Sequence, residues 1–388
     1  MSWPLVKLGD VAPAKACKHT FTDNESVWTL NLDQVEPGTG KVLQKVVVPK
    51  GEIGSSTHGF DDRHVLYSKL RPYLNKVVLP DEMGVATTEL VPMLPDAGRL
   101  DRKYLAYYLR SKSFVSWVSA QVAGAKMPRV SMKLFWDHEI PLPPLVEQKR
   151  IATILDKANA IRRKRKQAIQ LADEFLRAVF LDMFGDPVTN RKGFPLGTIR
   201  DLVESANYGS SAKASEAGGD YPILRMGNIT YEGAIDMTDL KYIDLSEKDK
   251  PKYLVVKGDL LFNRTNSKEL VGKAAVYDRD DPVAIAGYLI RVRTNEKGNS
   301  HYISGYLNSA HGKATLQNMC KSIVGMANIN AQEMQDIPIL IPPVSLQKRY
   351  RDIVASTKEK LVAHQAALSY NNEVFEALCQ KAFSGQLS

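Results

Sequence analysis

The sequence contains "PLPPLVEQKR" at Pro141–Arg150 and a closely similar stretch, "LIPPVSLQKR", at Leu340–Arg349, 199 residues further on. When Ile140–Arg150 is aligned with Ile339–Arg349, six of eleven positions are identical. The same ungapped offset continues to match as far as Phe184 and Phe383. Chance gives about one identity in such a stretch, so the chain contains an internal repeat.

The repeat extends beyond the proline phrases. "WPLVKLGDV" (Trp3–Val11) is echoed by "FPLGTIRDL" (Phe194–Leu202), and "VLYSKL" (Val65–Leu70) is echoed by "LLFNRT" (Leu260–Thr265). "GAKMPRVS" and "GMANIN" occupy the same place, just before each proline phrase. We therefore interpret the chain as one unit written twice, with boundaries at 1–140 and 187–336 for the mixed regions and at 141–186 and 337–388 for the helical ones.

The segments after the double prolines are predicted to be long helices. Proline is tolerated in the first turn of a helix but not in its interior, so each double proline marks a helix start. Residues 147–182 contain no Gly or Pro, which predicts a helix of about 54 Å. Apolar residues step by seven in both copies, and such heptads are typical of two helices packed as a coiled coil. The heptad residues are Ile154, Ile161, Ala168 and Phe175 in the first copy and Leu361, Leu368 and Phe375 in the second.

The two mixed regions have the pattern of α+β domains. Short β-type runs alternate with Gly, Asn, Asp and Pro, and a short helix is expected near 104–117 and again near 302–319. The predicted fold class is therefore α+β, with two mixed domains separated by two long antiparallel helices in a pseudo-twofold repeat. Such an arrangement suits a DNA duplex that carries two short sites about one helical turn, or roughly 34 Å, apart.

Composition narrows the class of protein. The 388 residues carry a formal net charge of +9 and a pI near 9.2, which favours a polyanionic partner. Three cysteines far apart indicate neither a disulfide framework nor a zinc site. The N-terminus lacks the apolar core of a secretory signal, and no apolar run has the length of a membrane span. We expect a cytoplasmic protein that has no membrane partner.

Taken together, the proline phrase, the following Gln-Lys-Arg and the heptads resemble specificity subunits of type I restriction–modification systems, over the full length of the chain. The resemblance implies two target recognition domains, each reading one half of a bipartite double-stranded DNA sequence. It implies partners: two methyltransferase subunits and, for cleavage, restriction (translocase–nuclease) subunits. It also makes the long helices the spacer and docking surface, which we assign to Gln148, Arg150, Ile154, Ile161, Phe175, Gln347, Arg349, Leu361, Leu368 and Phe375.

Catalytic motifs are missing from the sequence. The two double prolines lack the flanking residues with which an adenine methyltransferase holds its flipped base. "ELVGKAAVY" lacks the upstream Gly and the Ser/Thr of a phosphate-binding loop. Asp96 and Asp101 imitate a nuclease but are too close together in the sequence. The seven histidines show no metal-ligand spacing beyond the isolated pair His58 and His64. We therefore expect a chain that is not an enzyme by itself and has no metal, with S-adenosylmethionine, ATP and Mg²⁺ bound only by partner subunits.

Base reading requires polar and basic side chains on surface loops or strands. Clusters of such residues fall at aligned places in the two copies. In the first copy the candidate DNA-binding residues are Ser56, His58, Lys69, Arg71, Tyr73, Lys76, Lys126 and Arg129. In the second they are Ser211, Lys213, Arg225, Asn228, Arg264, Asn266 and Lys268. For each residue alone, a solvated turn is the competing interpretation.

Two alternatives remain open in the sequence. The basic run "RRKRK" at Arg162–Lys166 is either a solvated helix face, a contact to the DNA backbone or a contact to acidic patches on a partner. The whole chain also fits a non-catalytic assembly protein that uses its helices for association and binds proteins instead of DNA. Such a protein has no need for paired basic clusters at aligned loops.

Overall fold

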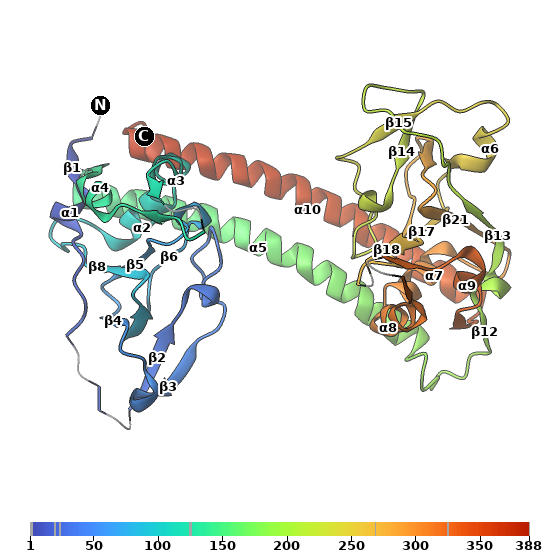
Figure 1. The fold of residues 1–388 in the computed structure, drawn as a ribbon, viewed down its shortest axis with the longest axis horizontal. Helices are drawn as coiled ribbons and strands as arrows, with labels where there is room; N and C mark the ends of the chain where they lie inside the picture. The colour runs from blue at the N-terminus through green and yellow to red at the C-terminus, as the bar shows by residue number, and fades with distance from the viewer. Residues whose placement is uncertain are drawn as a thin grey trace. The chain divides into compact units, whose positions relative to one another are not determined.

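The computed structural model describes residues 3–18, 21–22, 25–123, 126–267, 269–323 and 326–387. The chain forms two compact units, which we call unit 1 (residues 1–166 and 366–388) and unit 2 (residues 167–365) (Figure 1). Each unit is a mixed α/β domain joined to one part of each of two long helices. The predicted α+β class with two long helices is confirmed. The boundaries between the two units fall within the long helices, so each helix contributes one part to unit 1 and one part to unit 2.

The long helices begin where the sequence predicts. Helix α5 spans Leu145–Phe184 and α10 spans Val344–Ser384. In the first turn of α5 the Glu147 N–H donates to Pro144 O at 2.8 Å, and in α10 the Leu346 N–H donates to Pro343 O at 2.9 Å. Gly185 and Gly385 follow the two helices with φ of 76° and 79°, the left-handed conformation that ends a helix at low steric cost.

Unit 1 contains two main sheets, ordered β3-β2-β7-β4 and β6-β5-β8, and two paired ribbons, β1–β11 and β9–β10. Its strands are β1 (Leu5–Lys7), β2 (Ser26–Leu30), β3 (Val46–Pro49), β4 (Thr57–Phe60), β5 (Val65–Ser68), β6 (Val77–Val78), β7 (Gly84–Thr87), β8 (Leu90–Met93), β9 (Val122–Ala123), β10 (Arg129–Val130) and β11 (Glu139–Pro141). Its helices besides α5 and α10 are α1 (Leu8–Val11), α2 (Arg102–Arg110), α3 (Lys112–Ser119) and α4 (Met132–Asp137), with 3₁₀ turns at Leu32–Gln34, Lys50–Glu52 and Pro72–Leu74.

Unit 2 contains sheets ordered β13-β21-β17-β19, β15-β14-β20-β16 and β18-β23-β22, and the ribbon β12–β24. Its strands are β12 (Leu196–Thr198), β13 (Val203–Tyr208), β14 (Tyr221–Leu224), β15 (Lys241–Ile243), β16 (Leu254–Val255), β17 (Leu260–Asn263), β18 (Thr265–Asn266), β19 (Ala274–Val276), β20 (Val283–Ile285), β21 (Leu289–Thr294), β22 (Lys321–Ile323), β23 (Met326–Asn328) and β24 (Pro338–Leu340). Its helices are α6 (Lys250–Tyr253), α7 (Ser300–Leu307), α8 (Ala310–Met319) and α9 (Ala331–Gln335), with 3₁₀ turns at Ile199–Leu202 and Met226–Asn228.

The strand pairing repeats in the two units. β1 pairs antiparallel with β11, which directly precedes the first double proline, and β12 pairs in the same way with β24 before the second. Two further strand pairs correspond, because β5 pairs antiparallel with β8 and β17 pairs antiparallel with β21. We call β5 and β17 the central strands. The offset between the two copies is 191 residues at Trp3 and Phe194 and 199 residues at Arg150 and Arg349, and this change reflects loop-length differences within one architecture.

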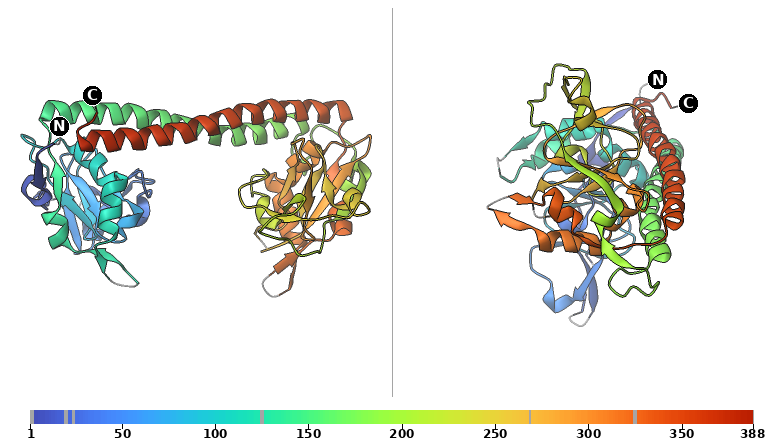
Figure 2. Two further views of the ribbon diagram at one scale, coloured as in Figure 1. Left: turned by 90° about the horizontal axis from the view of Figure 1, so that it is seen from above. Right: turned by 90° about the vertical axis from the view of Figure 1, so that its right-hand side faces the viewer.

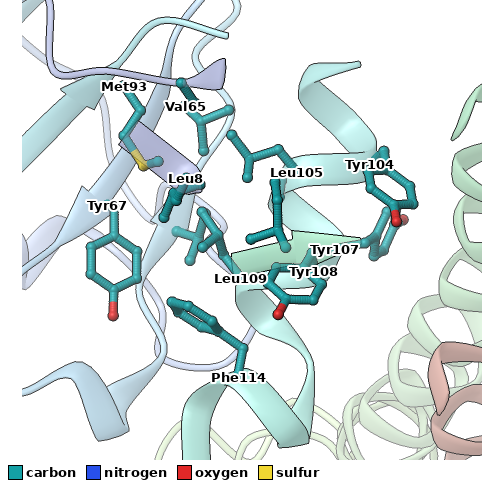
Figure 3. Close-up of a cluster of buried hydrophobic side chains, with 14 of the residues drawn as sticks. Leu8, Val65, Tyr67, Met93, Tyr104, Leu105, Tyr107, Tyr108, Leu109 and Phe114 are labelled. Carbon is teal, nitrogen blue, oxygen red and sulfur yellow. The ribbon is translucent and has the colours of Figure 1, made fainter. Parts of the chain in front are cut away.

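Helix α2 packs against the sheet β6-β5-β8, which we call the central sheet of unit 1. On α2, Leu105 and Leu109 are buried and belong to one core with Val65 and Met93 from the strands (Figure 3). The other side of α2 faces the long helices, where the Tyr104 ring meets the Phe383 ring with centroids 5.4 Å apart. The hydrophobic core of unit 1 is thus continuous from its central sheet to the end of α10.

The glutamine of the repeated Gln-Lys-Arg phrase joins each long helix to its domain. Gln148 is fully buried, accepts from Asp101 N–H at 2.8 Å and donates to Arg99 O at 2.8 Å and to Pro143 O at 2.7 Å. Gln347 is equally buried and donates to Lys297 O at 2.9 Å and Pro342 O at 2.8 Å. Each side chain satisfies backbone groups of the loop before α2 or α7, so the duplicated phrase fixes the start of the helix against its domain.

Within each unit the two helix segments run antiparallel and are in contact. In unit 1 the guanidinium of Arg162 lies 4.3 Å from the ring centroid of Phe375 and donates to Asn372 at 2.8 Å. In unit 2 the ring of Tyr350 lies 5.4 Å from that of Phe180. Ile154, Leu361, Leu368 and Phe375 are half-buried, whereas Ile161 and Phe175 remain about half exposed. The predicted heptads therefore leave apolar residues on the surface of the helices. Among the described residues, no helix has the length and apolarity needed to cross a membrane.

Candidate nucleic-acid interface

A two-stranded hairpin projects from each unit on the side away from α5 and α10 (Figure 2). We call these the distal hairpins; they are formed by β9 and β10 in unit 1 and by β22 and β23 in unit 2. The segment that follows the central strand pairs with the hairpin base, through a Leu70–Arg129 bridge in unit 1 and a Thr265–Asn328 pair in unit 2. The repeated architecture therefore brings the two predicted clusters of each copy, far apart in sequence, to one place.

Lys69 and Arg264 occupy equivalent positions at this place. Each directly follows its central strand, β5 or β17. The Lys69 N–H donates to Glu89 O and its carbonyl accepts from Val130 N–H, at 3.0 and 3.1 Å. The Arg264 N–H donates to Tyr288 O and its carbonyl accepts from Ile329 N–H, at 3.0 and 2.9 Å. Both units thus hold a basic residue by the same two backbone contacts beside a distal hairpin.

Three further predicted residues of unit 1 join Lys69 at the distal hairpin. Arg71 is exposed, has a φ of 49° and donates its backbone N–H to Pro128 O at 2.8 Å. Lys126 is exposed on the hairpin. Arg129 is exposed but pairs with Glu89 (Nη2 to Oε1, 2.8 Å), and this guanidinium lowers the pKa of the Glu89 carboxyl. Among the described residues, the side chains of Arg71 and Lys126 have no hydrogen-bond or ion-pair partner. Arg129, in contrast, would have to break its ion pair with Glu89 before it could contact a phosphate or a base.

The remaining candidates of unit 1 fall elsewhere. Tyr73 is half exposed on the 3₁₀ turn after Arg71, and Ser56 is exposed just before β4. The ammonium of Lys76 donates to Leu32 O at 2.6 Å, and burial lowers its pKa, so this side chain is used inside the domain. His58 of β4 and Lys69 line one cavity of about 270 Å³.

In unit 2 the predicted residues divide into free and internally bonded side chains. Ser211 and Lys213 are exposed in the segment after β13. Arg225 is half-buried and pairs with Asp239 at 2.8 Å. Asn228 is buried and its amide donates to Asp236 O and Asp239 O, at 2.9 and 3.0 Å, so it holds the loop and presents no group to a base.

Two candidates remain on the segment after Arg264. Asn266 of β18 is half-buried, and its side-chain Oδ1 accepts from Ser267 N–H at 2.9 Å. Lys268 lies outside the described residues.

Tyr208, which is not among the predicted residues, lies beneath Arg264. The guanidinium carbon of Arg264 is 4.7 Å from the centroid of the Tyr208 ring, a cation–π geometry. The Tyr208 hydroxyl accepts from Ala331 N–H at 3.0 Å, which fixes the ring against the first turn of α9. Tyr208 opens the stretch "YGSSAK" (208–213), from which only Ser211 and Lys213 are predicted to contact DNA.

The predicted helix residues divide by exposure. Gln148 and Gln347 are internal, while Arg150 and Arg349 are exposed, with Arg150 paired to Glu147 at 2.7 Å. In the basic run, Arg162 packs on Phe375 and Lys166 lies 3.7 Å from Glu36. Arg163 and Lys164 are exposed. Lys166 is exposed as well, so among the described residues of the run Arg163 and Lys164 are exposed side chains outside the two contacts just named.

Buried histidines do not form a reactive group. Burial lowers the pKa of His138 and of His301 to about 4, so both rings are neutral near pH 7. His138 accepts or donates one hydrogen bond with the Tyr108 hydroxyl at 2.9 Å. Within the part of the chain that the structure describes, no three His, Cys, Asp or Glu residues are placed to hold a metal ion.

Comparison with known proteins gives one consistent result. The profile of the type I restriction modification DNA specificity domain matches residues 2–171 and 192–365. The EcoKI specificity subunit of Escherichia coli K12 is 26% identical over 306 residues, which cover 74% of this chain and 65% of that protein. The StySPI specificity subunit of Salmonella potsdam is 25% identical, again over 74% of this chain and 65% of that protein. The chain thus spans less than two thirds of the length of these two relatives.

A solved structure extends the likeness to the fold. The crystal structure of a type I restriction–modification system S subunit from M. genitalium superposes with a TM-score of 0.60, covering 98% of this chain and 96% of that one. Its sequence is 15% identical, so this likeness concerns the fold alone. None of these findings favours the alternative of a protein-binding assembly module.

Proposed function

We propose, from the premise that this chain belongs to the type I restriction–modification DNA specificity family, that it reads the target sequence for a DNA-modifying complex. In this role unit 1 and unit 2 each read one half of a bipartite duplex target, and the long helices set the distance between the halves. The observation that carries the proposal is the duplicated position of Lys69 and Arg264, held by matching backbone contacts beside the two distal hairpins.

The chemistry at these positions suits the major groove or the phosphate backbone. Arginine and lysine are the side chains that most often contact guanine edges and phosphates. Arg71 and Lys126 add exposed positive charge to the hairpin of unit 1, and Ser211 and Lys213 add polar donors in unit 2. A net charge of +9 supplies the sequence-independent part of the attraction.

We further propose that catalysis belongs to partner subunits. Two methyltransferase subunits would dock on the long helices, where Ile161 and Phe175 are about half exposed, and restriction subunits would join for cleavage. S-adenosylmethionine, ATP and Mg²⁺ would then be bound by those partners and not by this chain. This role belongs in the cytoplasm, where the DNA is.

The proposal is tested by affinity capture followed by methylome sequencing. The full chain, used as bait in its host, should retain a methyltransferase subunit. Deleting its gene should remove methylation at one bipartite motif and leave other methylation unchanged. An unchanged methylome, or capture of assembly proteins without a methyltransferase, would contradict the proposal.

A further inference from the structure

The cavity of about 270 Å³ in unit 1 is placed beside the proposed DNA interface. Its wall is formed by the segment before β2, by β4 and β8, and by α4; the residues that matter here are Ala16, His58, Lys69, Met132 and Trp136. His58 and Lys69 are half-buried, and Lys15 at the rim is exposed. Among the described residues that line this cavity, none carries a carboxylate.

The corresponding place in unit 2 is filled by an aromatic ring. Strand pairing fixes the correspondence: Ala14 bridges Met93 in unit 1 as Ala206 pairs with Val292 in unit 2, which makes Ala16 the counterpart of Tyr208. The same registers match Lys69 with Arg264.

Tyr208 makes contacts at the positions that line the cavity of unit 1. Its ring lies under Arg264, the counterpart of Lys69, and its hydroxyl is bonded to the N–H of Ala331, the counterpart of Met132. The cavity of unit 1 therefore exists because Ala16 stands where unit 2 has Tyr208. Its empty volume corresponds to the position that the Tyr208 ring takes beneath Arg264 in unit 2.

We propose that this cavity receives an extrahelical nucleobase of the bound duplex, seated beneath Lys69 in the position that the Tyr208 ring holds in unit 2. The inference rests on the proposed function and adds to it a base-extrusion step on one half of the target. A nucleobase fits better than a partner's aromatic side chain because Lys15 and Lys69 line the cavity with ammonium groups that attract the attached phosphates.

Contacts inside the cavity can offset the free energy needed to extrude a base from the duplex. Taking a base out of the stack costs free energy, and enzymes that flip bases recover it in a pocket with stacking and polar contacts. Here Trp136 and Met132 offer apolar contact, Lys69 a cation over the ring, and His58 a polar edge. Loss of a single base–aromatic stack lowers affinity by about tenfold or more.

The experiment fills the cavity with the ring of the other copy. Duplexes that bind the full chain, purified with its methyltransferase, are first selected from a randomised library. Each position of the selected duplex is then replaced in turn by 2-aminopurine, whose fluorescence rises when the base leaves the stack. The native chain should raise the fluorescence at one position. Ala16→Tyr should abolish that rise and weaken binding by about tenfold, while Ala16→Ser, which adds no ring at this exposed site, should behave as the native chain.

Every other outcome has a distinct meaning. If the native chain selects no duplex, the proposed function itself fails and this inference with it. If a duplex is selected but no position gains fluorescence, or if Ala16→Tyr binds and fluoresces like the native chain, base extrusion into this cavity is refuted while DNA reading stands. If Ala16→Tyr binds DNA normally but loses the methyltransferase, the cavity takes a protein side chain instead.

Discussion

Gly305 of α7 lies directly against the ring of Phe180 of α5. A Cβ on Gly305 would lie 2.7 Å from Phe180 Cδ2 and 3.0 Å from Tyr350 Oη, inside the distance that real side chains keep. In the sequence repeat, Tyr107 is the counterpart of Gly305 and Cys379 is the counterpart of Phe180. The large and small residues have changed places between the two units, so at this pair of positions each unit carries one aromatic ring.

Gly305→Ala is therefore expected to destabilise unit 2 by about 1–3 kcal/mol through overpacking. In an open helix site the same change usually stabilises by up to about 1 kcal/mol, so the sign of the effect is diagnostic. Urea unfolding of the purified chain measures it. Gly227→Ala is the control, since nothing lies within 4 Å of the Cβ position there. Equal behaviour of the two variants would mean that the Gly305–Phe180 contact is not rigid.

The buried glutamines should differ in their contribution to stability. Gln148→Ala removes one acceptor and two donor contacts and leaves three backbone groups unpaired in the interior, which predicts a loss of roughly 3 kcal/mol. Gln347 makes two such bonds, and its Oε1 has no partner among the described residues, so Gln347→Ala should cost less. Denaturant midpoints of the two variants test this order. A larger loss for Gln347→Ala would contradict it.

Arg264→Ala should relax recognition at one position of the target. A well-placed arginine discriminates between bases by about 1–3 kcal/mol, and its removal should leave the remaining positions read as before. Methylome sequencing of the variant strain gives the answer at base resolution. Arg279→Ala, at an exposed arginine of the same unit, is the matched control. Unchanged methylation sites in the Arg264 variant would remove this residue from the base-reading set.

Neutralising Arg163 and Lys164 should weaken DNA binding without changing the sequence that is read. Both side chains are exposed, whereas Arg162 and Lys166 have internal partners. If both contact phosphates, Arg163→Gln with Lys164→Gln lowers the slope of log affinity against log salt by about two. Fluorescence anisotropy over a range of salt concentrations measures it. An altered target sequence, or an unchanged slope, would assign the run another role.

Stability should fall as the solution is acidified from pH 6.5 to about pH 4. His138 and His301 have pKa values lowered by burial to about 4, so between these limits the unfolded chain binds protons that the folded chain does not. The stabilisation is fully present above pH 6.5 and is lost as pH falls toward 4, with roughly 3 kcal/mol per histidine as an upper bound. Unfolding free energies at several pH values test this. His138→Gln should flatten the dependence, and an equally steep curve in that variant would place its origin elsewhere.

The architecture could be predicted from the sequence because each pattern occurs twice, once in each copy of the repeat. Proline, glycine and heptad spacing located both long helices, and the aligned strands of the two copies follow the echoed stretches. What could not be read was the exposure of single helix residues: Ile161 and Phe175 satisfy the heptad rule yet stay about half exposed. Their environment depends on how the domains pack, which the spacing of apolar residues does not encode.

The candidate site was predictable as a region but not residue by residue. Lys69 and Arg264 were predicted because basic residues align at this place in both copies, and the structure holds the two residues by equivalent backbone contacts. Asn228 was misleading, since an amide that caps a turn and an amide that reads a base look alike in a sequence. Tyr208 and Ala16 become meaningful only when strand registers show that they are counterparts.

Unit 1 is assembled from both ends of the sequence: residues 366–388 complete a core that residues 1–166 begin, through contacts such as that of Phe383 with Tyr104. Unit 2, by contrast, is one uninterrupted segment. On the ribosome, unit 2 can therefore mature first although it is encoded second, and unit 1 has to wait for the last turns of α10 to emerge. A nonsense mutation that removes those turns is expected to unfold unit 1 while sparing unit 2.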